Sequence, residues 1–301
     1  MELIQLDAFD GKIITVNVWD NVDKAIGTVI ISHGMAEHAG RYDDFARFLN
    51  ENKYYVLAVN HRGHKYNNAG EKGMVKGDSY AQSIEDIHTL VTYAKEKYGK
   101  EVILLGHSYG SFLAQRYIEL HSSDIKACVL SGTAYMKSAL ISMGRAIANL
   151  QRSILGPDKK GKLINTLSFG AYNKPFKEQK QQFAWLSRDK EQVEKYQNDE
   201  YCGYVLSLGF YSSFFNGLHT MYGSDADRIR KDIPILIAVG SDDPVSNNAA
   251  LAHQLYDFYI SKELKNVEIK IYENARHEIL NEINRDEVYK DILTFINAQF
   301  A

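Results

Sequence analysis

The sequence of 301 residues has only two cysteines, and their positions indicate no metal or redox site. Cys128 stands in an apolar, strand-like run and Cys202 in a polar, aromatic segment, so the two form no metal-spaced or redox pair. We expect both thiols to be reduced, as is usual in a cytosol. Internal repeats and low-complexity tracts are also missing, and residues 156–162 are the stretch most typical of a flexible loop.

An excess of charge of either sign is missing as well. The 35 Lys and Arg residues nearly balance the 38 Asp and Glu residues, and the formal net charge is −3. We therefore expect no electrostatic footprint for nucleic acid or for an anionic membrane surface. Residues 1–7 contain acidic side chains and no uninterrupted apolar run, so we expect no signal peptide and no transmembrane segment. These observations predict a cytoplasmic protein whose partners bind in pockets.

Short apolar runs alternate with helical patterns along most of the chain. This alternation predicts a mostly parallel, doubly wound sheet with helices on both faces, the α/β class. The Asp10-Gly11 pair between two strand patterns, residues 3–8 and 12–18, indicates a hairpin, so the sheet should begin with antiparallel strands. Further strands are expected at residues 28–32, 55–59, 102–105, 127–130, 233–239 and 267–272. Helices are expected at residues 41–51, 81–98, 108–121, 249–260 and 287–299.

The alternation stops between Thr133 and Arg228, a stretch with no convincing strand. Residues 133–228 are therefore predicted to form a helical cap, or lid, inserted into a core of residues 1–132 and 229–301. Helices within it are expected at residues 138–150, 177–186, 191–196 and 206–218. The cap has more aromatic residues than its own small core needs, so some of them should line a pocket. A homodimer through exposed cap aromatics is also permitted.

Residues 106–110 read Gly-His-Ser-Tyr-Gly and stand between a strand pattern and a helical pattern. A serine on a sharp strand-to-helix turn needs very small residues two places before and two places after it, because strand and helix backbones nearly touch there. Gly106 and Gly110 meet this need. The stretch is therefore interpreted as a nucleophile elbow that presents Ser108.

A serine hydroxyl becomes nucleophilic only with a base beside it and an acid that orients the base. In enzymes with such an elbow the acid and then the histidine follow the serine along the chain. Asp242 and Asp243 come just after one strand pattern and His277 just after the next, where sheets of this class build their sites. We expect His277 to be the base. The two adjacent aspartates leave the acid open at this point, with Asp243 preferred.

The tetrahedral intermediate of such a reaction needs backbone N–H donors for its oxygen. One comes from the residue after the nucleophile, which is Tyr109. The second normally comes from the loop after an earlier strand, and here Gly34 lets the backbone turn so that the amide of Met35 is the natural donor. His33 and Glu37 are then interpreted as residues that brace this loop. No group of histidines has metal-ligand spacing on a shared helix, so a hydrolytic zinc site is not expected.

Together these motifs resemble the serine aminopeptidase S33-like branch of the α/β-hydrolases, which includes monoacylglycerol lipases and lysophospholipases. The matching stretches are residues 33–38 with Arg41-Tyr42, 60–64, 106–110, 240–245, 272–273 and 276–278. The resemblance implies nucleophile Ser108, acid Asp243 rather than Asp242, base His277, and oxyanion amides of Met35 and Tyr109. Lys65 departs from the family, which usually has a further glycine there. Residues 185–189 resemble bacterial lysophospholipase-like relatives.

The residues and the resemblance predict a serine hydrolase that cleaves a small-molecule acyl ester of monoacylglycerol or lysophospholipid type, with no cofactor. Two alternatives keep the scaffold. A thioesterase is one, and the other is an aminopeptidase, for which Glu178, Asp189, Glu191 or Glu194 of the cap would hold the free amine. A third alternative, a non-catalytic binding protein, is disfavoured because all members of the catalytic set are present. Arg188 and Asp189 are interpreted as a surface ion pair rather than a head-group contact.

Overall fold

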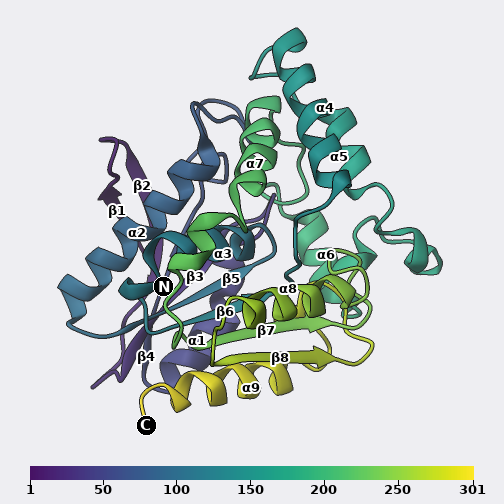
Figure 1. Cartoon of the computed structure of the whole chain (residues 1–301). Helices are drawn as coiled ribbons and strands as arrows, with labels where there is room; N and C mark the ends of the chain where they lie inside the picture. The colour runs from purple at the N-terminus through teal and green to yellow at the C-terminus, as the bar shows by residue number, and fades with distance from the viewer.

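A twisted sheet of eight strands runs through the middle of the protein (Figure 1). The structure is a computed structural model and describes residues 1–301. The strands are β1 (Glu2–Asp7), β2 (Ile13–Trp19), β3 (Gly27–Ser32), β4 (Tyr54–Val59), β5 (Val102–His107), β6 (Ala127–Ser131), β7 (Ile235–Gly240) and β8 (Val267–Tyr272). Their order in the sheet is β1-β2-β4-β3-β5-β6-β7-β8. β1 pairs antiparallel with β2, and β2 antiparallel with β4, whereas all other pairs are parallel. The predicted fold class is confirmed, including its antiparallel N-terminal edge.

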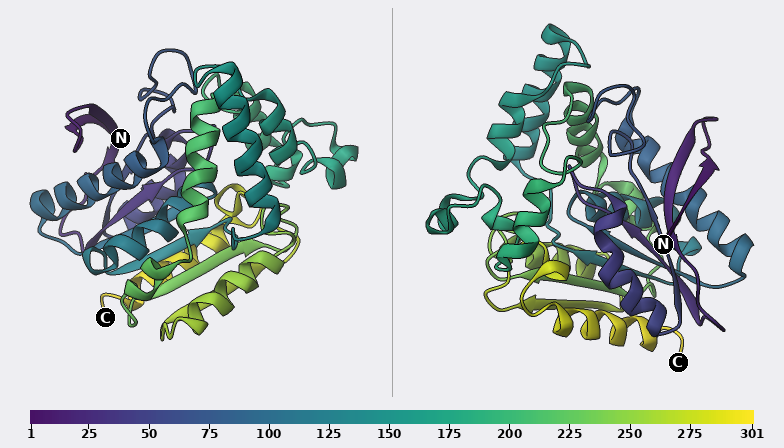
Figure 2. Two further views of the ribbon diagram at one scale, coloured as in Figure 1. Left: turned by 45° about the horizontal axis from the view of Figure 1, so that its top comes forward. Right: turned by 180° about the vertical axis from the view of Figure 1, so that it is seen from behind.

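Helices cover both faces of the sheet, as Figure 2 shows from two further directions. The helices of the core are α1 (Asp43–Glu51), α2 (Ser79–Tyr98), α3 (Tyr109–His121), α8 (Ala250–Ser261) and α9 (Arg285–Ala298). Alternate strand residues point to opposite faces. Ile30 and Leu104 therefore belong to the hydrophobic cluster under α2, α3 and α8, whereas Val29 and Ile103 belong to the one under α1 and α9. Because both faces are covered, the central strands β3 and β5 are buried along their whole length.

Residues 133–228, which we call the cap, connect β6 to β7 and lie over one end of the sheet (Figure 1). The elements of the cap are α4 (Ala139–Leu155), α5 (Lys162–Phe169), η3 (Lys174–Gln179), η4 (Ala184–Leu186), α6 (Lys190–Asn198), α7 (Leu208–Thr220) and η5 (Ser224–Arg228). α4 packs against α7, and α7 in turn packs against α2 of the core. No helix of the structure has the length and the apolar character that crossing a bilayer requires.

Two details of the cap differ from the sequence prediction. The prediction of one helix at residues 177–186 is wrong, because Lys180 takes a left-handed conformation (φ 54°) that ends η3. The guanidinium of Arg276 then binds the carbonyl oxygens of Ala184 and Ser187. The helix α5 (Lys162–Phe169) was not predicted; it is short, and Ile164 is its only buried residue.

Candidate active site

Ser108 stands at the junction of β5 and α3 with backbone angles of φ 53° and ψ −120°. A non-glycine residue with positive φ is strained and is common at functional sites. A side chain at Gly106 would overlap the carbonyl oxygen of Gly110, and one at Gly110 would overlap the carbonyl oxygen of Ser32. The close approach of strand and helix expected for the elbow is therefore confirmed, and it pushes the Ser108 side chain out at the end of the sheet.

Asp243 and His277 meet at the ends of β7 and β8. The Nδ1 of His277 lies 3.0 Å from the Oδ1 of Asp243, which also accepts the amide of Val245 at 2.8 Å. The carboxylate of Asp242 instead accepts the hydroxyl of Ser241 at 3.2 Å. Asp243 is fully buried, so its carboxylate faces the imidazole without competing water. Of the two adjacent aspartates, the structure brings only Asp243 to the histidine.

The second ring nitrogen of His277, Nε2, is buried and has no hydrogen-bond partner. His277 and Ser108 line the same pocket, so this nitrogen is available on the side of the molecule where the serine lies. Burial disfavours the charged ring, but the attraction and hydrogen bond of Asp243, with a smaller contribution from Glu278, raise the pKa of His277 above its ordinary value. The arrangement suits a histidine that receives a proton during a reaction.

The loop after β3 holds the amide of Met35 free between two bonded neighbours. The N–H of Gly34 donates to Glu37 at 2.5 Å, and the N–H of Ala36 donates to Nε2 of His64 at 3.0 Å. The N–H of Met35 has no acceptor in the chain. Tyr109 opens α3, where the first amides of a helix lack intrahelical partners. Both amides can therefore bind an oxyanion in this pocket.

A buried arginine joins this loop to the residue after His277. Arg41 donates to Glu37 at 2.5 Å and, through both terminal nitrogens, to Glu278 at 2.7 Å. Burial opposes ionisation of the two carboxyls, yet Arg41 lowers the pKa of both below the usual range. The hydroxyl of Tyr42 adds a bond of 2.8 Å to Glu37. Sequence reasoning missed the link to Glu278, and the only local signal was the Glu37–Arg41 spacing of one helical turn.

Four further histidines are buried near the site, and their rings bond loop backbone or the hydroxyls of strand serines. The amide of His61 donates to Nε2 of His33 at 3.0 Å, His64 accepts the amide of Ala36, and His107 lies 3.2 Å from the hydroxyl of Ser131. Burial lowers the pKa of His33 and His64 to about 3, that of His107 to about 4, and that of His61 well below 6.5. These rings are therefore neutral at pH 7. The predicted bracing role of His33 is confirmed, because its ring bonds the backbone of Gly34 and of His61.

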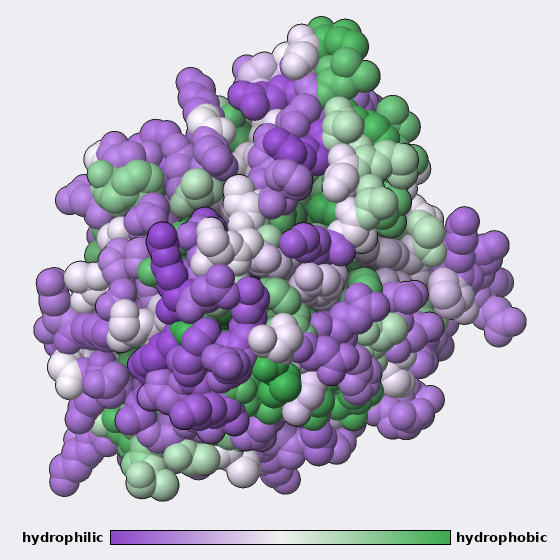
Figure 3. Space-filling model, viewed as in Figure 1, coloured by the Kyte–Doolittle hydropathy of each residue, from purple (hydrophilic) through white to green (hydrophobic).

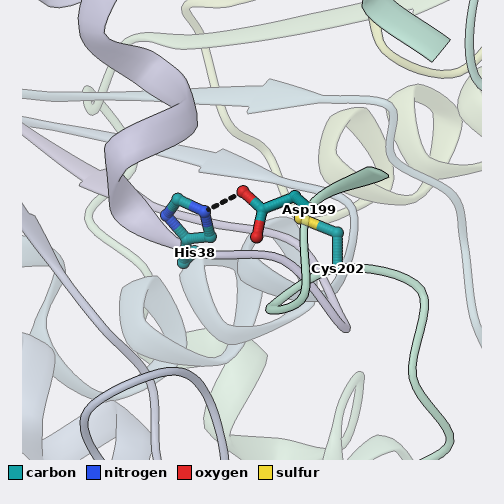
Figure 4. Close-up of side chains that lie close together, drawn as sticks. All are labelled: His38, Asp199 and Cys202. Carbon is teal, nitrogen blue, oxygen red and sulfur yellow. Dashed lines mark hydrogen bonds and ion pairs between the residues drawn. The ribbon is translucent and has the colours of Figure 1, made fainter. Parts of the chain in front are cut away.

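His38, Asp199 and Cys202 lie together where the cap meets the loop after β3 (Figure 4). The Nδ1 of His38 accepts the amide of Gly40 at 3.1 Å and lies 3.3 Å from the ammonium of Lys65, so Nε2 carries the proton and donates to Asp199 at 2.8 Å. Burial also raises the pKa of the Cys202 thiol. A protonated nitrogen and a protonated thiol are poor metal ligands, so this cluster ties cap to core by hydrogen bonding. Lys65 itself takes a left-handed conformation (φ 42°) that glycine adopts readily.

Two cavities meet at Ser108, and they differ in chemistry. A cavity of about 550 Å³ is lined almost entirely by apolar side chains of the cap, including Met143, Phe214 and Phe215. A second cavity of about 310 Å³ contains His277 and neutral polar side chains such as Asn165. Met35, Ser108 and Phe169 line both cavities. The expectation that cap aromatics line a pocket is confirmed by Phe169, Tyr172, Phe183, Trp185, Tyr204, Tyr211, Phe214 and Phe215.

The segment of the cap at residues 185–189 contacts the loop of His277. The ring of Trp185 lies 5.0 Å from that of His277, and the carbonyl of Leu186 accepts the amide of Glu278 at 2.7 Å. Arg188 pairs with Glu282 at 2.9 Å, and Asp189 pairs with Arg285 at 2.8 Å. Each residue is thus ion-paired with a residue of the core and not with the other, so the predicted surface pair of Arg188 with Asp189 is wrong. Neither residue lines the cavities at Ser108.

Comparison with known proteins matches residues 23–284 to the family described as "Serine aminopeptidase, S33". The chain is 27% identical to a monoglyceride lipase homolog of Monkeypox virus over 296 residues, which cover 96% of this chain and 94% of the relative. It is also 27% identical to a monoacylglycerol lipase of Mycolicibacterium smegmatis, covering 95% and 93% of the two chains. Among solved structures, a thermostable carboxyl esterase from Bacillus coagulans in complex with glycerol superposes with a TM-score of 0.90 at 25% identity, covering 100% and 99% of the two chains.

Proposed function

This chain belongs to the serine aminopeptidase S33 family of α/β-hydrolases and is a carboxylic ester hydrolase, and we propose that it cleaves monoacylglycerol-type esters through an acyl intermediate on Ser108. His277 and Asp243 activate the serine, and the amides of Met35 and Tyr109 bind the oxyanion. Residues 133–228 act as a cap that supplies the walls of both cavities. The observation that carries the proposal is the buried Asp243–His277 hydrogen bond beside a strained Ser108 in one pocket.

The proposed reaction has two steps. Nε2 of His277 takes the hydroxyl proton of Ser108 while the serine oxygen attacks the ester carbonyl, and the resulting oxyanion accepts hydrogen bonds from the two amides. The protonated ring then gives its proton to the leaving alcohol. In the second step the same nitrogen takes a proton from water, which attacks the acyl-serine and releases the acid. Asp243 keeps the ring oriented and stabilises its positive charge throughout.

The two cavities support an acyl chain on one side and a small alcohol on the other. The apolar cavity of about 550 Å³ offers a long alkyl chain a site in which its surface is removed from water. The cavity of about 310 Å³ presents the amides of Asn165 and Gln182, which suit the hydroxyls of glycerol. No Lys or Arg lines it, whereas a lysophospholipid head group would call for a cation near its phosphate. This contrast favours monoacylglycerol over lysophospholipid.

The aminopeptidase alternative lacks a free carboxylate for the substrate amine. None of the four cap acids considered for that role, Glu178, Asp189, Glu191 and Glu194, lines the cavities at Ser108. The acids that do line the polar cavity are Glu37 and Glu278, and both carboxylates are already ion-paired with Arg41. A thioesterase would use the same catalytic groups, so only a comparison of ester and thioester substrates distinguishes it from the proposed esterase.

A substrate panel tests the proposal. We expect hydrolysis of monoacylglycerols to exceed that of lysophosphatidylcholines with the same acyl chain, and also that of acyl thioesters and amino-acyl amides. A fluorophosphonate probe should label the wild-type protein and fail to label the Ser108→Ala variant. Equal labelling of the two proteins would contradict the nucleophile, whereas preferred turnover of lysophospholipid or amide would contradict only the substrate class.

Asp243→Asn is expected to lower kcat about 10⁴-fold, the loss produced by the equivalent change in a serine-protease triad. The amide cannot stabilise the imidazolium and favours the wrong tautomer of His277. Without the carboxylate the pKa of His277 should fall, so the acidic limb of the kcat/KM profile moves to lower pH. Asp242→Asn is the matched control and should keep both rate and profile. A comparable loss in Asp242→Asn would contradict the assignment.

A further inference from the structure

Two histidines from different helices stack on one another where α2 packs against α3. The ring centroids of His88 and His121 lie 4.2 Å apart, and the ring planes differ by 18°. His121 is the last residue of α3 and Ser108 directly precedes the first, so about 20 Å of helix separate the pair from the nucleophile. Because the two rings come from different helices, a search for ligand spacing on one helix does not reveal them.

One carboxylate faces both rings. The Nδ1 atoms of His88 and His121 each lie 3.8 Å from the same oxygen of Asp124, Oδ2. This distance is too long for a hydrogen bond between charged groups. It is close to the separation of two ligands on one ion, since donors bound to Zn²⁺ in a tetrahedral site lie about 3.4 Å apart. All three ligand atoms lie within 4.8 Å of one another, so small side-chain rotations would bring them onto one ion.

The other ring nitrogen of His121 faces a second carboxylate. Its Nε2 lies 3.7 Å from Oε1 of Glu85, which stands one turn before His88 on α2. Histidines that bind a metal usually donate their second ring N–H to a carboxylate, which leaves the lone pair on the ligating nitrogen. Glu85 is placed for this role. The hydroxyl of Tyr117 competes for Nδ1 of His88, but at 3.4 Å its bond is long and an ion can displace it.

The cluster has two negative charges without a Lys or Arg partner. Glu85 and Asp124 pair only with the two histidines. Protonation of both rings would place two positive charges face to face, with ring centroids 4.2 Å apart, where they repel each other. One divalent ion would neutralise both carboxylates and leave both rings neutral. The charges of the cluster therefore favour a metal ion over two protons.

We propose that His88, His121 and Asp124 bind a divalent transition-metal ion such as Zn²⁺, which pins α2 to α3. Two imidazoles and a carboxylate suit Zn²⁺, and water completes a four-coordinate site. Mg²⁺ and Ca²⁺ prefer oxygen ligands, so they fit poorly. The three side chains are between 23% and 39% exposed, and most of the face that Figure 3 shows is hydrophilic, so an ion can enter from water. The site goes beyond the proposed hydrolysis and does not require it.

Calorimetric titration of the full chain with Zn²⁺ tests the site. We expect saturable binding of one ion, and a Tm about 4 °C higher when free Zn²⁺ is 100 times the dissociation constant. His88→Gln/His121→Gln removes two of the three ligands and should abolish both effects. Glu85→Gln removes only the partner of the ligand and should weaken binding about tenfold or more. Turnover of a short-chain ester without metal should persist in these variants, which shows that they are folded.

A matched control removes two histidines from other helices. His219 and His253 are exposed on α7 and α8, and His219→Gln/His253→Gln should bind Zn²⁺ and gain stability like the wild type. Ser108→Ala should also bind it normally, so a failure of the metal site is distinguished from a failure of the proposed function. The inference is overturned if no Zn²⁺ binds, if His88→Gln/His121→Gln binds it as tightly as the wild type, or if the control loses binding equally.

Discussion

Ser108→Ala is expected to lower kcat for monoacylglycerol about 10⁶-fold, close to the loss seen when the nucleophile of subtilisin is removed. In the proposed mechanism no acyl intermediate forms without the Oγ of Ser108, and His277 has no hydroxyl to activate. What remains comes from the oxyanion amides of Met35 and Tyr109 and from substrate binding. Single-turnover and steady-state hydrolysis measure the loss of activity, and thermal unfolding of the same sample shows whether the variant is folded.

Ser111→Ala is the matched control, because it removes a hydroxyl from the same helix, one turn away. The hydroxyl of Ser111 bonds the carbonyl of Ser108 and the hydroxyl of Thr133, so its loss should cost about 1 kcal/mol of stability and little activity. If Ser108→Ala kept more than about one per cent of the wild-type kcat while remaining folded, another nucleophile would have to act.

Acidification is expected to unfold the protein steeply, because His33, His61, His64 and His107 are buried in neutral form. Burial lowers the pKa of His33 and His64 to about 3 and that of His107 to about 4, and that of His61 falls well below 6.5. Between pH 6.5 and about 4 the unfolded chain therefore binds protons that the folded chain does not. Each histidine contributes a slope of up to about 1.4 kcal/mol per pH unit, so the free energy of unfolding should fall by up to about 5 kcal/mol per unit near pH 5.

Denaturant titrations at several pH values between 7 and 5 measure this slope. His107→Asn should lower the overall stability but reduce the slope by about 1.4 kcal/mol per pH unit, because one buried titrating ring is gone. His253→Gln changes an exposed histidine on α8 and should leave the slope unchanged. A free energy of unfolding that is flat over this range would show that the four rings accept protons without unfolding.

Much of the fold could be read from local sequence patterns. The central strands are buried on both faces, so they appear as continuous apolar runs, and the expected strands coincide with the observed ones to within a few residues. The cap was harder. α5 buries only Ile164, and the helix expected at residues 177–186 ends at the left-handed Lys180, while Arg276, far along the chain, binds the carbonyl of Ala184. A partner so distant in sequence leaves no periodic signal.

The sequence by itself predicted a nucleophile elbow at Ser108 and an order of serine, aspartate and histidine along the chain, because a sharp turn between two glycines and a polar residue at a strand end are local features. Only the tertiary structure decided what depends on contacts between distant segments. It placed Asp243 rather than Asp242 on His277, and it linked Arg41 to Glu278 across the sheet end. It also joined two cavities at Ser108 and stacked a histidine of α2 on one of α3. Packing sets which faces meet and which remain exposed, and packing is a property of the whole chain.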